Sequence, residues 1–260
     1  MKKRWKEIVE KTNQAGSITV YSLSKEIGVS EVTIRKDLSE LEKRNLLTRN
    51  HGGASSLQSI VPSFSHRELI EKKEKEKIAL KVSKLIEDGD SVLIDAGTTP
   101  LAVAEKLKER KISIITNSIP VGIKLTNSNS NISFTGGEMS KENMGLYGPD
   151  AEDYLENLKV NKLILGASGL NLDEGLTTSS SLEMSMKKSM VKSAKTVIAV
   201  FDHSKFTKMK PFVFAGFNDI DVIVTTGKVP LEICKILKNR NIELIVSNEE
   251  DKHVYDKLQN

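Results

Sequence analysis

The chain has 260 residues, of which 38% are hydrophobic and 28% are charged. This composition is ordinary for a globular protein, and the length suffices for one small and one medium domain, each with its own core. No run approaches the roughly 18 consecutive apolar residues of a membrane span, and residues 1–11 lack the apolar core of a signal peptide. We therefore expect two domains, a cytoplasmic location and no membrane partner.

The positive charge of the chain lies in its first 55 residues. They contain 11 of the 39 Lys and Arg residues and 7 of the 35 Asp and Glu residues, and the rest of the chain contains 28 of each sign. Contacts of Lys and Arg with phosphates supply most of the sequence-independent affinity of proteins for DNA. Charged residues often only solvate a surface, so this surplus of four is weak support on its own.

The first 28 residues predict two short helices. Apolar residues recur at helical spacing over residues 5–12, and Gly16 ends that helix. A short extended piece over residues 17–20 follows. A second helix over residues 21–27 then stops at Gly28, where we expect a tight turn.

A third helix follows, with two distinct faces. Ser30 caps it, and Ile34, Leu38 and Leu41 form its core face at spacing i, i+4 and i+7. The rest of the helix presents short hydrogen-bonding groups and cations: Glu31, Thr33, Arg35, Lys36 and Ser39. A recognition helix needs such groups to reach base edges. We expect Ser30 and the first four of these residues to contact DNA.

A hairpin closes the head. Residues 46–48 predict a strand, and Gly52 and Gly53 permit a turn after it. The segment therefore predicts a wing that holds Arg49 and His51 near the DNA backbone or the minor groove. The alternative is a three-helix interaction domain with an exposed charged helix. The helix spacing, the cap, the wing and the charge surplus together favour DNA binding.

A polar stretch separates the head from a larger body. Residues 55–62 are polar and small, which is typical of a linker. Residues 66–87 predict one amphipathic helix whose lysines and glutamates form a solvated face. We assign residues 1–55 to a winged helix-turn-helix domain, 56–74 to the linker and 75–260 to an effector-sensing domain.

The body alternates apolar strands with helical segments. Strands are predicted at residues 91–95, 112–116, 131–135, 162–167, 196–201, 222–225 and 242–246. Such alternation indicates an open, largely parallel α/β sheet with helices on both faces. Ligands of such folds bind outside the carboxyl ends of the strands, which is where binding residues are expected.

The first strand end offers a phosphate site. Asp95 and Ala96 are followed there by Gly97, Thr98 and Thr99, which lead into a helix. Free backbone N–H groups, two hydroxyls and the helix dipole favour an anion at such a position. The alternative is an ordinary strand-to-helix turn with a threonine cap. We expect Asp95, Gly97, Thr98 and Thr99 to bind an effector.

Residues at other strand ends could converge on the same effector. They are Thr116, Asn117, Gly136, Gly137, Asp202 and Lys205. Asparagine can bond sugar hydroxyls, and glycines let the backbone approach a ligand. A carboxylate can accept from hydroxyls, and an ammonium can neutralise a phosphate. Each of these residues is also common in turns or in surface ion pairs, so singly they mean little.

Neither cysteine nor histidine indicates a metal site or a catalytic thiol. Cys234 continues an apolar helical pattern and is predicted to be a small buried hydrophobe. The four histidines, at positions 51, 66, 203 and 253, lack the spacing of metal-binding motifs. We expect no disulfide, no metal and no cofactor.

The head resembles a known family. The run from Ile18 to Glu42 and the closing His51-Gly52-Gly53-Ala54 strongly resemble the DeoR family of bacterial repressors. The resemblance extends over nearly the whole chain, with Arg67 and residues 74–79 standing where that family enters its effector domain. It implies operator binding by the winged head and release by a sugar-phosphate metabolite.

The body resembles the sensor domain of the same family. The shared segments, which in that family surround the effector, are the Gly-Thr-Thr loop, the Thr-Asn pair, the Gly-Gly turn, Gly175-Leu176-Thr177 and residues 202–206. The resemblance implies a fold like that of ribose-5-phosphate isomerase. These segments resemble family members that regulate amino-sugar or sugar-acid use more than those that regulate glycerol or deoxynucleoside use.

Two other functions compete with a regulator. A sugar-phosphate isomerase needs a general base and an acid, for which Asp95, Glu174, Asp202 and Lys205 are available, but the chain lacks a dense acidic motif and an enzyme needs no DNA-binding head. A DNA-organising protein would not need a sensor-sized body. We expect a non-enzymatic, homo-oligomeric repressor of a carbohydrate operon. The sequence leaves open whether the effector relieves or promotes DNA binding.

Overall fold

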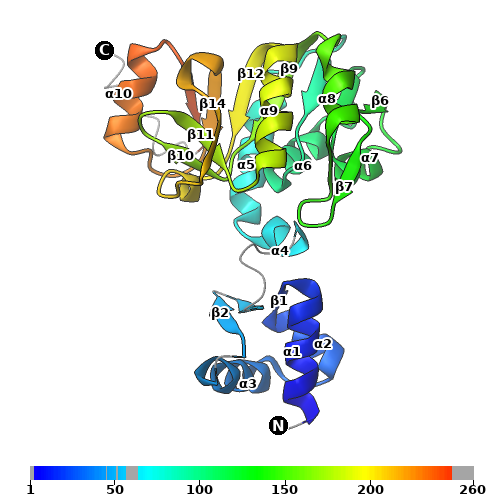
Figure 1. Ribbon diagram of the computed structural model, residues 1–260, viewed down its shortest axis with the longest axis vertical. Coiled ribbons are helices and arrows are strands. Elements are labelled where there is room, and N and C mark those ends of the chain that lie inside the picture. Colours follow the sequence, from blue (N-terminus) through cyan, green and yellow to red (C-terminus); the bar gives the residue numbers. More distant parts are fainter. Residues whose placement is uncertain (1–2, 45, 51, 57–63, 248–260) are drawn as a thin grey trace. The chain divides into compact units, whose positions relative to one another are not determined.

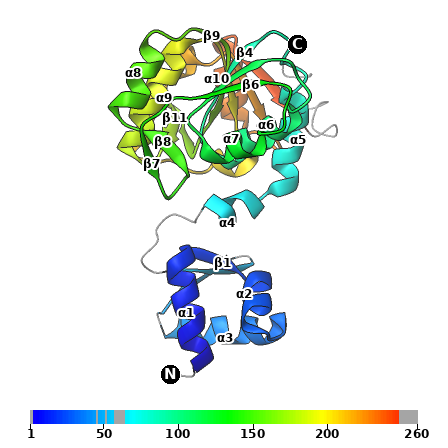
Figure 2. The ribbon, with the colours of Figure 1, turned by 90° about the vertical axis from the view of Figure 1, so that its right-hand side faces the viewer.

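The chain folds into two compact units. The computed structural model describes residues 3–44, 46–50, 52–56 and 64–247. The units are Met1–Ile70 and Glu71–Asn260, which we call the head and the body (Figures 1 and 2). Each has its own hydrophobic core. No helix in the described ranges is long and apolar enough to cross a membrane.

The head combines helices with a small sheet. Its elements are α1 (Lys3–Ala15), β1 (Ser17–Thr19), α2 (Val20–Ile27), α3 (Glu31–Lys43), β2 (Thr48–Asn50), β3 (Gly53–Ser55) and α4 (Phe64–Leu69). The strands form an antiparallel sheet in the order β1-β3-β2. The three predicted helices and a hairpin are confirmed, and the extended piece before α2 is the third strand. The strand predicted at residues 46–48 begins only at Thr48, because Leu47 packs into the core of the head.

A buried carboxylate ties α1 to α3. Asp37 of α3 accepts hydrogen bonds from Arg4 Nε at 2.6 Å and from Trp5 Nε1 at 2.7 Å. A carboxylate can be buried when it is paired and hydrogen-bonded in this way. Ile34 and Leu38, on the same side of α3, are buried in the core of the head. The inner face of α3 is thus fixed, and its outer face is left to solvent.

The body is built on a seven-stranded sheet. In sheet order the strands are β15 (Glu243–Val246), β14 (Val222–Thr225), β12 (Ala194–Val200), β9 (Val160–Gly166), β4 (Ser91–Ile94), β5 (Ser113–Thr116) and β6 (Asn131–Phe134). Every neighbouring pair is parallel. These are the strands predicted from the apolar runs, so the parallel α/β architecture is confirmed.

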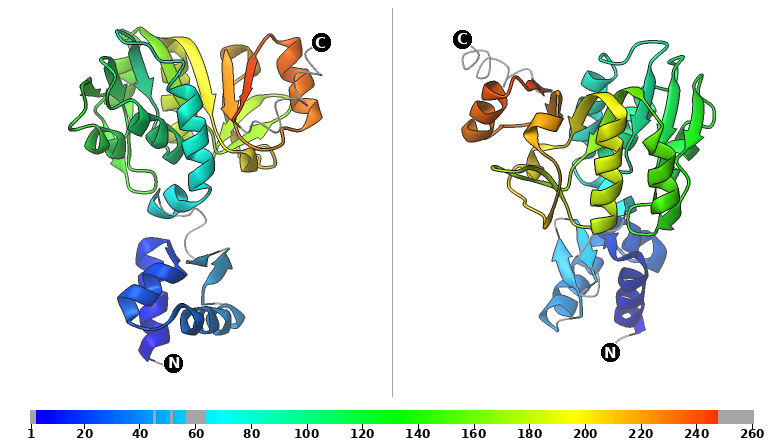
Figure 3. Two further views of the ribbon diagram at one scale, coloured as in Figure 1. Left: turned by 180° about the vertical axis from the view of Figure 1, so that it is seen from behind. Right: turned by 45° about the horizontal axis from the view of Figure 1, so that its top comes forward.

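Helices cover both faces of this sheet. They are α5 (Lys72–Val82), α6 (Thr98–Lys106), α7 (Ile119–Lys124), α8 (Pro149–Glu156), α9 (Ser181–Ser193) and α10 (Leu231–Asn239), with short 3-10 turns η1 (His203–Lys205) and η2 (Phe217–Asp219). Helices α8 and α9 lie on one face, and α5 and α6 lie on the other (Figures 1 and 3). Cys234 of α10 is half-buried and packs against the core of the body.

The single helix predicted over residues 66–87 is wrong. The segment forms two helices, α4 and α5, separated by Ile70 and Glu71, and Glu71 has a left-handed φ of 52°. A left-handed residue interrupts the helical hydrogen-bond ladder. The break coincides with the boundary between head and body. Helix α5 also ends at Val82, five residues before the predicted end.

Five short strands were not predicted. They are β7 (Glu138–Ser140), β8 (Gly145–Tyr147), β10 (Gly169–Asn171), β11 (Gly175–Thr178) and β13 (Phe212–Ala215). Strands β7 and β8 form a hairpin, and β10, β11 and β13 form a separate antiparallel sheet. The hairpin and the small sheet are formed by segments that follow main-sheet strands in the chain, as the expected ligand residues also do.

Candidate functional site

The N-terminus of α3 is closed by its own side chains. Ser30 Oγ accepts a hydrogen bond from Thr33 N at 3.3 Å and lies 3.0 Å from Thr33 Oγ1. Arg35 Nη2 donates to Glu31 Oε2 at 2.7 Å, one turn earlier. Four of the predicted DNA contacts are therefore paired with one another in the free protein, and Arg35 keeps further N–H donors beside its bond to Glu31.

The outer face of α3 is a continuous stripe. Its residues recur at spacings of three and four and are Val32, Arg35, Lys36, Ser39 and Lys43. All of them except the half-buried Ser39 are exposed. A helix that enters the major groove reads bases with such a face near its N-terminal end. The predicted residues Arg35 and Lys36 lie on this stripe.

The hairpin is tied to α3. Glu42 Oε1 accepts a hydrogen bond from the backbone N–H of Arg49 at 2.7 Å, and the Arg49 side chain is exposed on β2. At Gly53, a Cβ atom would lie 2.0 Å from Ile18 O. Glycine is required there because β1 and β3 approach so closely. The other predicted wing contact, His51, lies outside the described residues.

In the body, the strand order reverses between β4 and β9. From β4 the chain continues to β5 and β6 on one side, and from β9 it continues to β12, β14 and β15 on the other. The connections after these two strands therefore lead away in opposite directions. We call the carboxyl ends of β4 and β9 the switch point, since ligands of open α/β sheets bind at such a reversal.

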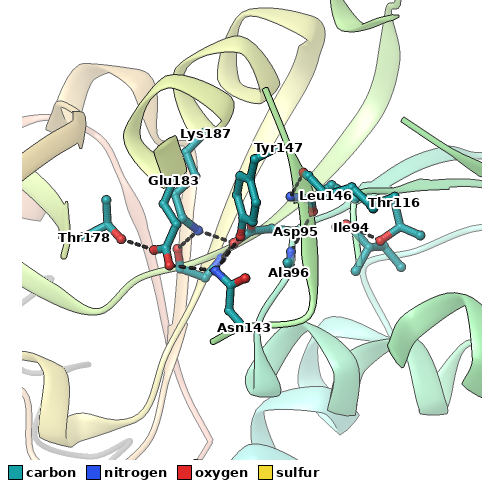
Figure 4. A network of polar contacts seen from close by, with 12 residues as sticks. Ile94, Asp95, Ala96, Thr116, Asn143, Leu146, Tyr147, Thr178, Glu183 and Lys187 are labelled. Carbon is teal, nitrogen blue, oxygen red and sulfur yellow. Dashed lines mark hydrogen bonds and ion pairs between the residues drawn. The ribbon is translucent and has the colours of Figure 1, made fainter. Parts of the chain in front are cut away.

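A buried ion pair occupies the switch point. Asp95, directly after β4, forms a short ion pair with Lys187 Nζ of α9 (Figure 4). The same carboxylate oxygen accepts from Gly166 N of β9 at 3.0 Å, and Lys187 Nζ donates to Gly166 O at 2.9 Å. Both side chains are almost fully buried. This pair locks β4, β9 and α9 together.

The second oxygen of Asp95 is left over. Asp95 Oδ1 is buried and has no hydrogen-bond partner within the described part of the chain. Burial raises the pKa of Asp95, while Lys187 and the hydrogen bond from Gly166 oppose that rise. A buried carboxylate oxygen without a partner is energetically unfavourable unless something completes it. Asp95 thus has one unused acceptor.

A second polar cluster lies beside the ion pair. Glu183, one turn before Lys187 on α9, accepts from Asn143 Nδ2 at 2.7 Å and forms a short hydrogen bond with Thr178 of β11. Asn143 Nδ2 also donates to Tyr147 Oη at 2.6 Å (Figure 4). Sequence reasoning missed this cluster and Lys187. A usable signal was the i+4 spacing of Glu183 and Lys187 beside apolar Met residues.

The predicted Thr116 and Asn117 are fully buried and support neighbouring loops. Thr116 Oγ1 donates to Ile94 O at 2.7 Å. Asn117 Oδ1 accepts from Ala96 N at 2.8 Å, and its Nδ2 donates to Leu146 O at 3.3 Å. The amide of Asn117 holds the loop after β4 against β8, and the hydroxyl of Thr116 joins the ends of β5 and β4. The structure thus gives both residues a positioning role.

The predicted Gly136 and Gly137 lead into the β7–β8 hairpin. Both have positive φ, and a Cβ atom at Gly137 would lie 2.4 Å from Tyr147 O. A Cβ atom at Gly145 of the same hairpin would lie 2.7 Å from the Cβ of Ala96. The hairpin therefore packs directly on the loop that carries Asp95. Glycine at positions 137 and 145 makes that close packing possible, whereas Gly136 has open space around its Cβ position and serves the turn through its positive φ.

The start of α6 is the best anion site among the predicted residues. Gly97 precedes the helix, and no side chain caps the first N–H groups. Thr98 is half-buried and Thr99 is buried. Uncapped N–H groups at a helix N-terminus attract an anion, and the helix dipole reinforces them. This helix end is adjacent to Asp95 in the chain and lies at the switch point.

The predicted Asp202 and Lys205 lie one strand beyond β9, after β12. Asp202 is buried, and its Oδ1 accepts from Ser204 N at 2.9 Å. Burial opposes its ionisation, but Lys205, the bonds to Ser204 and the charge of Lys75 outweigh burial and hold the pKa of this carboxyl below its ordinary value. The Asp202 carboxylate therefore caps the short 3-10 turn η1 that follows it, and Lys205 of that turn is half-buried.

The predicted effector residues follow strands that are spread across the sheet. They follow β6, β5, β4 and β12, and the outer two of these strands are separated by four strand spacings, about 19 Å. A phosphorylated sugar is shorter than that. The residues after β4 lie at the switch point, with those of β5 and β12 on its two sides. Gly136 and Gly137 affect the site indirectly, because they lead into the β7–β8 hairpin that packs on the loop of Asp95.

Glu174, which the isomerase alternative would use, is not brought to the switch point. It lies in the turn between β10 and β11, where Glu174 Oε2 accepts from Asn171 Nδ2 at 2.8 Å. Within the described ranges, no group of three or more His, Cys, Asp or Glu side chains could hold a metal ion.

Comparison with solved structures finds a distant likeness. A ribose 5-phosphate isomerase from Methanocaldococcus jannaschii aligns over 53% of this chain and 55% of its own, with 16% identity and a TM-score of 0.40. A likeness of that size carries no inference about chemistry.

Comparison of sequences is decisive. The DeoR-like helix-turn-helix domain matches residues 4–60, and the DeoR C-terminal sensor domain matches residues 70–227. The transcriptional repressor AccR of Agrobacterium fabrum is 36% identical over 94% of this chain and 97% of its own length. The glycerol-3-phosphate regulon repressor of Escherichia coli is 32% identical over 91% and 95%. The chain belongs to the DeoR family of transcriptional regulators.

Proposed function

We propose that this protein represses a carbohydrate-utilisation operon and leaves its operator when a phosphorylated sugar or sugar derivative binds at the switch point. The observation that carries the proposal is the uncapped start of α6 beside the unused oxygen of Asp95. One position thus offers N–H donors for a phosphate and an acceptor for a hydroxyl. The name of the Escherichia coli relative, a glycerol-3-phosphate regulon repressor, supports this ligand class.

Each group at the switch point has a distinct task in this proposal. The N–H groups after Gly97 and the hydroxyl of Thr98 hold the phosphate. Lys205, on the neighbouring strand end, contributes positive charge. The ion pair of Asp95 and Lys187 positions the carboxylate that receives a ligand hydroxyl. An isomerase would need a carboxylate as general base, but Asp95 is engaged in an ion pair with Lys187. We propose that the ligand is bound and released without chemical change.

The head supplies operator binding in the same proposal. Residues 1–55 dock α3 in the major groove, where Arg35 and Lys36 reach bases and phosphates, and Arg49 contacts the backbone from the wing. Residues 56–74, which include α4 and the start of α5, connect this DNA-binding part of the head to the sensor, residues 75–260. Bodies of two or more chains associate and place their heads on repeated half-sites, as symmetric regulators do. The protein acts in the cytoplasm, where DNA and sugar phosphates are both present.

Ligand-dependent unfolding of the full chain tests the sensor. The midpoint of thermal unfolding is measured against a panel of phosphorylated sugars and their unphosphorylated counterparts. A ligand at 100 times its Kd stabilises the native state by about 2.7 kcal/mol, which shifts the midpoint visibly. We expect one phosphorylated compound to do so. No shift with any member of the panel would contradict the proposed ligand class.

Variants locate the site. Thr98→Ala removes a hydroxyl at the start of α6 and is expected to reduce the shift strongly. Thr126→Ala is the matched control, because Thr126 is exposed just after α7, away from the carboxyl ends of the strands. Equal shifts in the two variants would place the ligand elsewhere.

A further inference from the structure

Val32 is, with Tyr21 of α2, one of the large hydrophobic residues exposed on the head. Its side chain is 61% exposed, although it is a large aliphatic group in the first turn of α3. It lies outside the hydrophobic core of the head and outside the partly buried residues that pack on that core. The fold of the head therefore gains no buried contact from this valine.

Helix stability gives no reason for a valine at this position either. A β-branched side chain in a helix loses χ1 freedom, so valine is a poorer helix former than alanine by roughly half a kcal/mol. An exposed helix position that needs only stability favours alanine or a straight-chain residue. Valine at this position therefore leaves an aliphatic surface that neither the core nor helix stability uses.

The position of Val32 on α3 indicates which binding partner its side chain contacts. Val32 shares the outer stripe of α3 with Arg35 and Lys36. Its neighbours in the first turn are occupied: Ser30 and Thr33 cap the helix, and Glu31 holds Arg35. Val32 is the apolar member of this face and lies near the N-terminus, the part of a recognition helix that reaches base edges.

We infer that Val32 reads the C5-methyl group of one thymine in the major groove of the operator. That methyl group is the one apolar feature of the major-groove edge of the bases, and aliphatic side chains recognise it by contact. Val32 thereby sets sequence preference, whereas Lys36 adds affinity for any duplex. The inference rests on the proposed docking of α3 in the major groove.

A thymine-to-uracil scan tests the inference. The full-length protein first selects a preferred duplex from randomised double-stranded DNA. Each thymine of one half-site is then replaced by deoxyuridine, which removes only the methyl group, and the affinity of wild type and Val32→Ala is measured for every duplex. We expect wild type to lose about fourfold at one thymine, the effect of about one buried methylene. Val32→Ala should lose no further affinity there.

The inference is overturned if the effect of removing a thymine methyl group does not depend on Val32. If uracil substitution weakens wild type and Val32→Ala by the same factor at every position, Val32 contacts no methyl group. Thermal unfolding of Val32→Ala serves as the folding control. Its midpoint should equal or slightly exceed that of wild type, because an exposed valine is replaced by a better helix former.

Lys36→Ala separates this inference from the docking on which it rests. Loss of a phosphate contact should weaken binding to all duplexes alike and reduce the salt dependence of log K by about one. If Lys36→Ala has no effect, the docking of α3 is wrong and both proposals fail. If Lys36→Ala weakens binding while the uracil scan shows no coupling to Val32, only the role of Val32 is wrong.

Discussion

Asp95 and Lys187 are both almost fully buried, and each supplies the charge that the other needs. Removing one partner of such a pair leaves an uncompensated charge in the interior, which costs about 3–5 kcal/mol. We expect Lys187→Met to lower the free energy of unfolding of the body by that amount in denaturant titrations at neutral pH. Lys188→Met is the matched control, since Lys188 is the exposed neighbour. Similar losses in both variants would show that the pair is not a structural lock.

Asp202 makes the body sensitive to acid. Its pKa lies below the ordinary value of 3.8, so the folded state binds the proton more weakly than the unfolded state. The stabilisation by the carboxylate is complete above the unfolded pKa and is lost as the pH falls through the folded pKa. We expect Asp202→Asn to be less stable than wild type from about pH 5 to 7, with the difference shrinking below about pH 4. A difference independent of pH would contradict this.

Sequence reasoning found Asp95 but not its partner. Lysines in charged helices usually lie in solvent, and Lys187 stands next to another lysine in a helix of mixed polarity. The i+4 spacing of Glu183 and Lys187 beside methionines hints at an inward face, and the packing of α9 on the sheet shows that Lys187 faces inward while Lys188 faces out. Likewise, Asn117 was expected to bind the ligand, but its side-chain amide forms hydrogen bonds with the backbone of Ala96 and Leu146. Such assignments depend on tertiary partners that a single sequence does not display.

At the scale of elements, the head depends on one close approach. A Cβ atom at Gly53 would lie 2.0 Å from Ile18 O, and neither backbone can yield without breaking the pairing of β1 with β3. We expect Gly53→Ala to destabilise the head by at least about 1–3 kcal/mol and to weaken operator binding severely. Fluorescence anisotropy with labelled operator measures the loss. The ligand-induced thermal shift of the body is the internal control and should be retained; normal operator binding would contradict this account.

The elements that sequence predicted correctly share a physical signature. The central strands of the main sheet are short apolar runs rich in Val, Ile and Leu, because parallel strands inside a sheet are buried on both faces. The edge strand β6 is mostly exposed and has a weaker apolar pattern. The missed strands β7, β8, β10 and β11 are short, and three of them begin at a glycine, so their pattern resembles that of turns. Strands β7 and β8 pair with each other, as do β10 and β11, so both are local hairpins, and only β13 comes from a segment further along the chain. The break at Glu71 had no signal, since glutamate is a good helix former.

At the scale of the whole molecule, the function requires that the ligand bind the operator-free and operator-bound states with different affinity. Coupling between two sites is reciprocal, and typical coupling free energies change affinity by about 5–150-fold. The ligand can shift the population of operator-bound protein only by this differential affinity. A tight ligand without such a difference would stabilise the body and leave repression unchanged.

Operator affinity with and without ligand is therefore the most direct test of the central claim. The full chain is titrated with labelled operator in the absence and presence of the saturating phosphorylated compound that stabilises the body. We predict that the ligand weakens operator binding by at least about fivefold in wild type. Thr98→Ala, at the same ligand concentration, should show little or no change. An operator affinity that is unaltered in wild type, with the ligand demonstrably bound, would contradict the account.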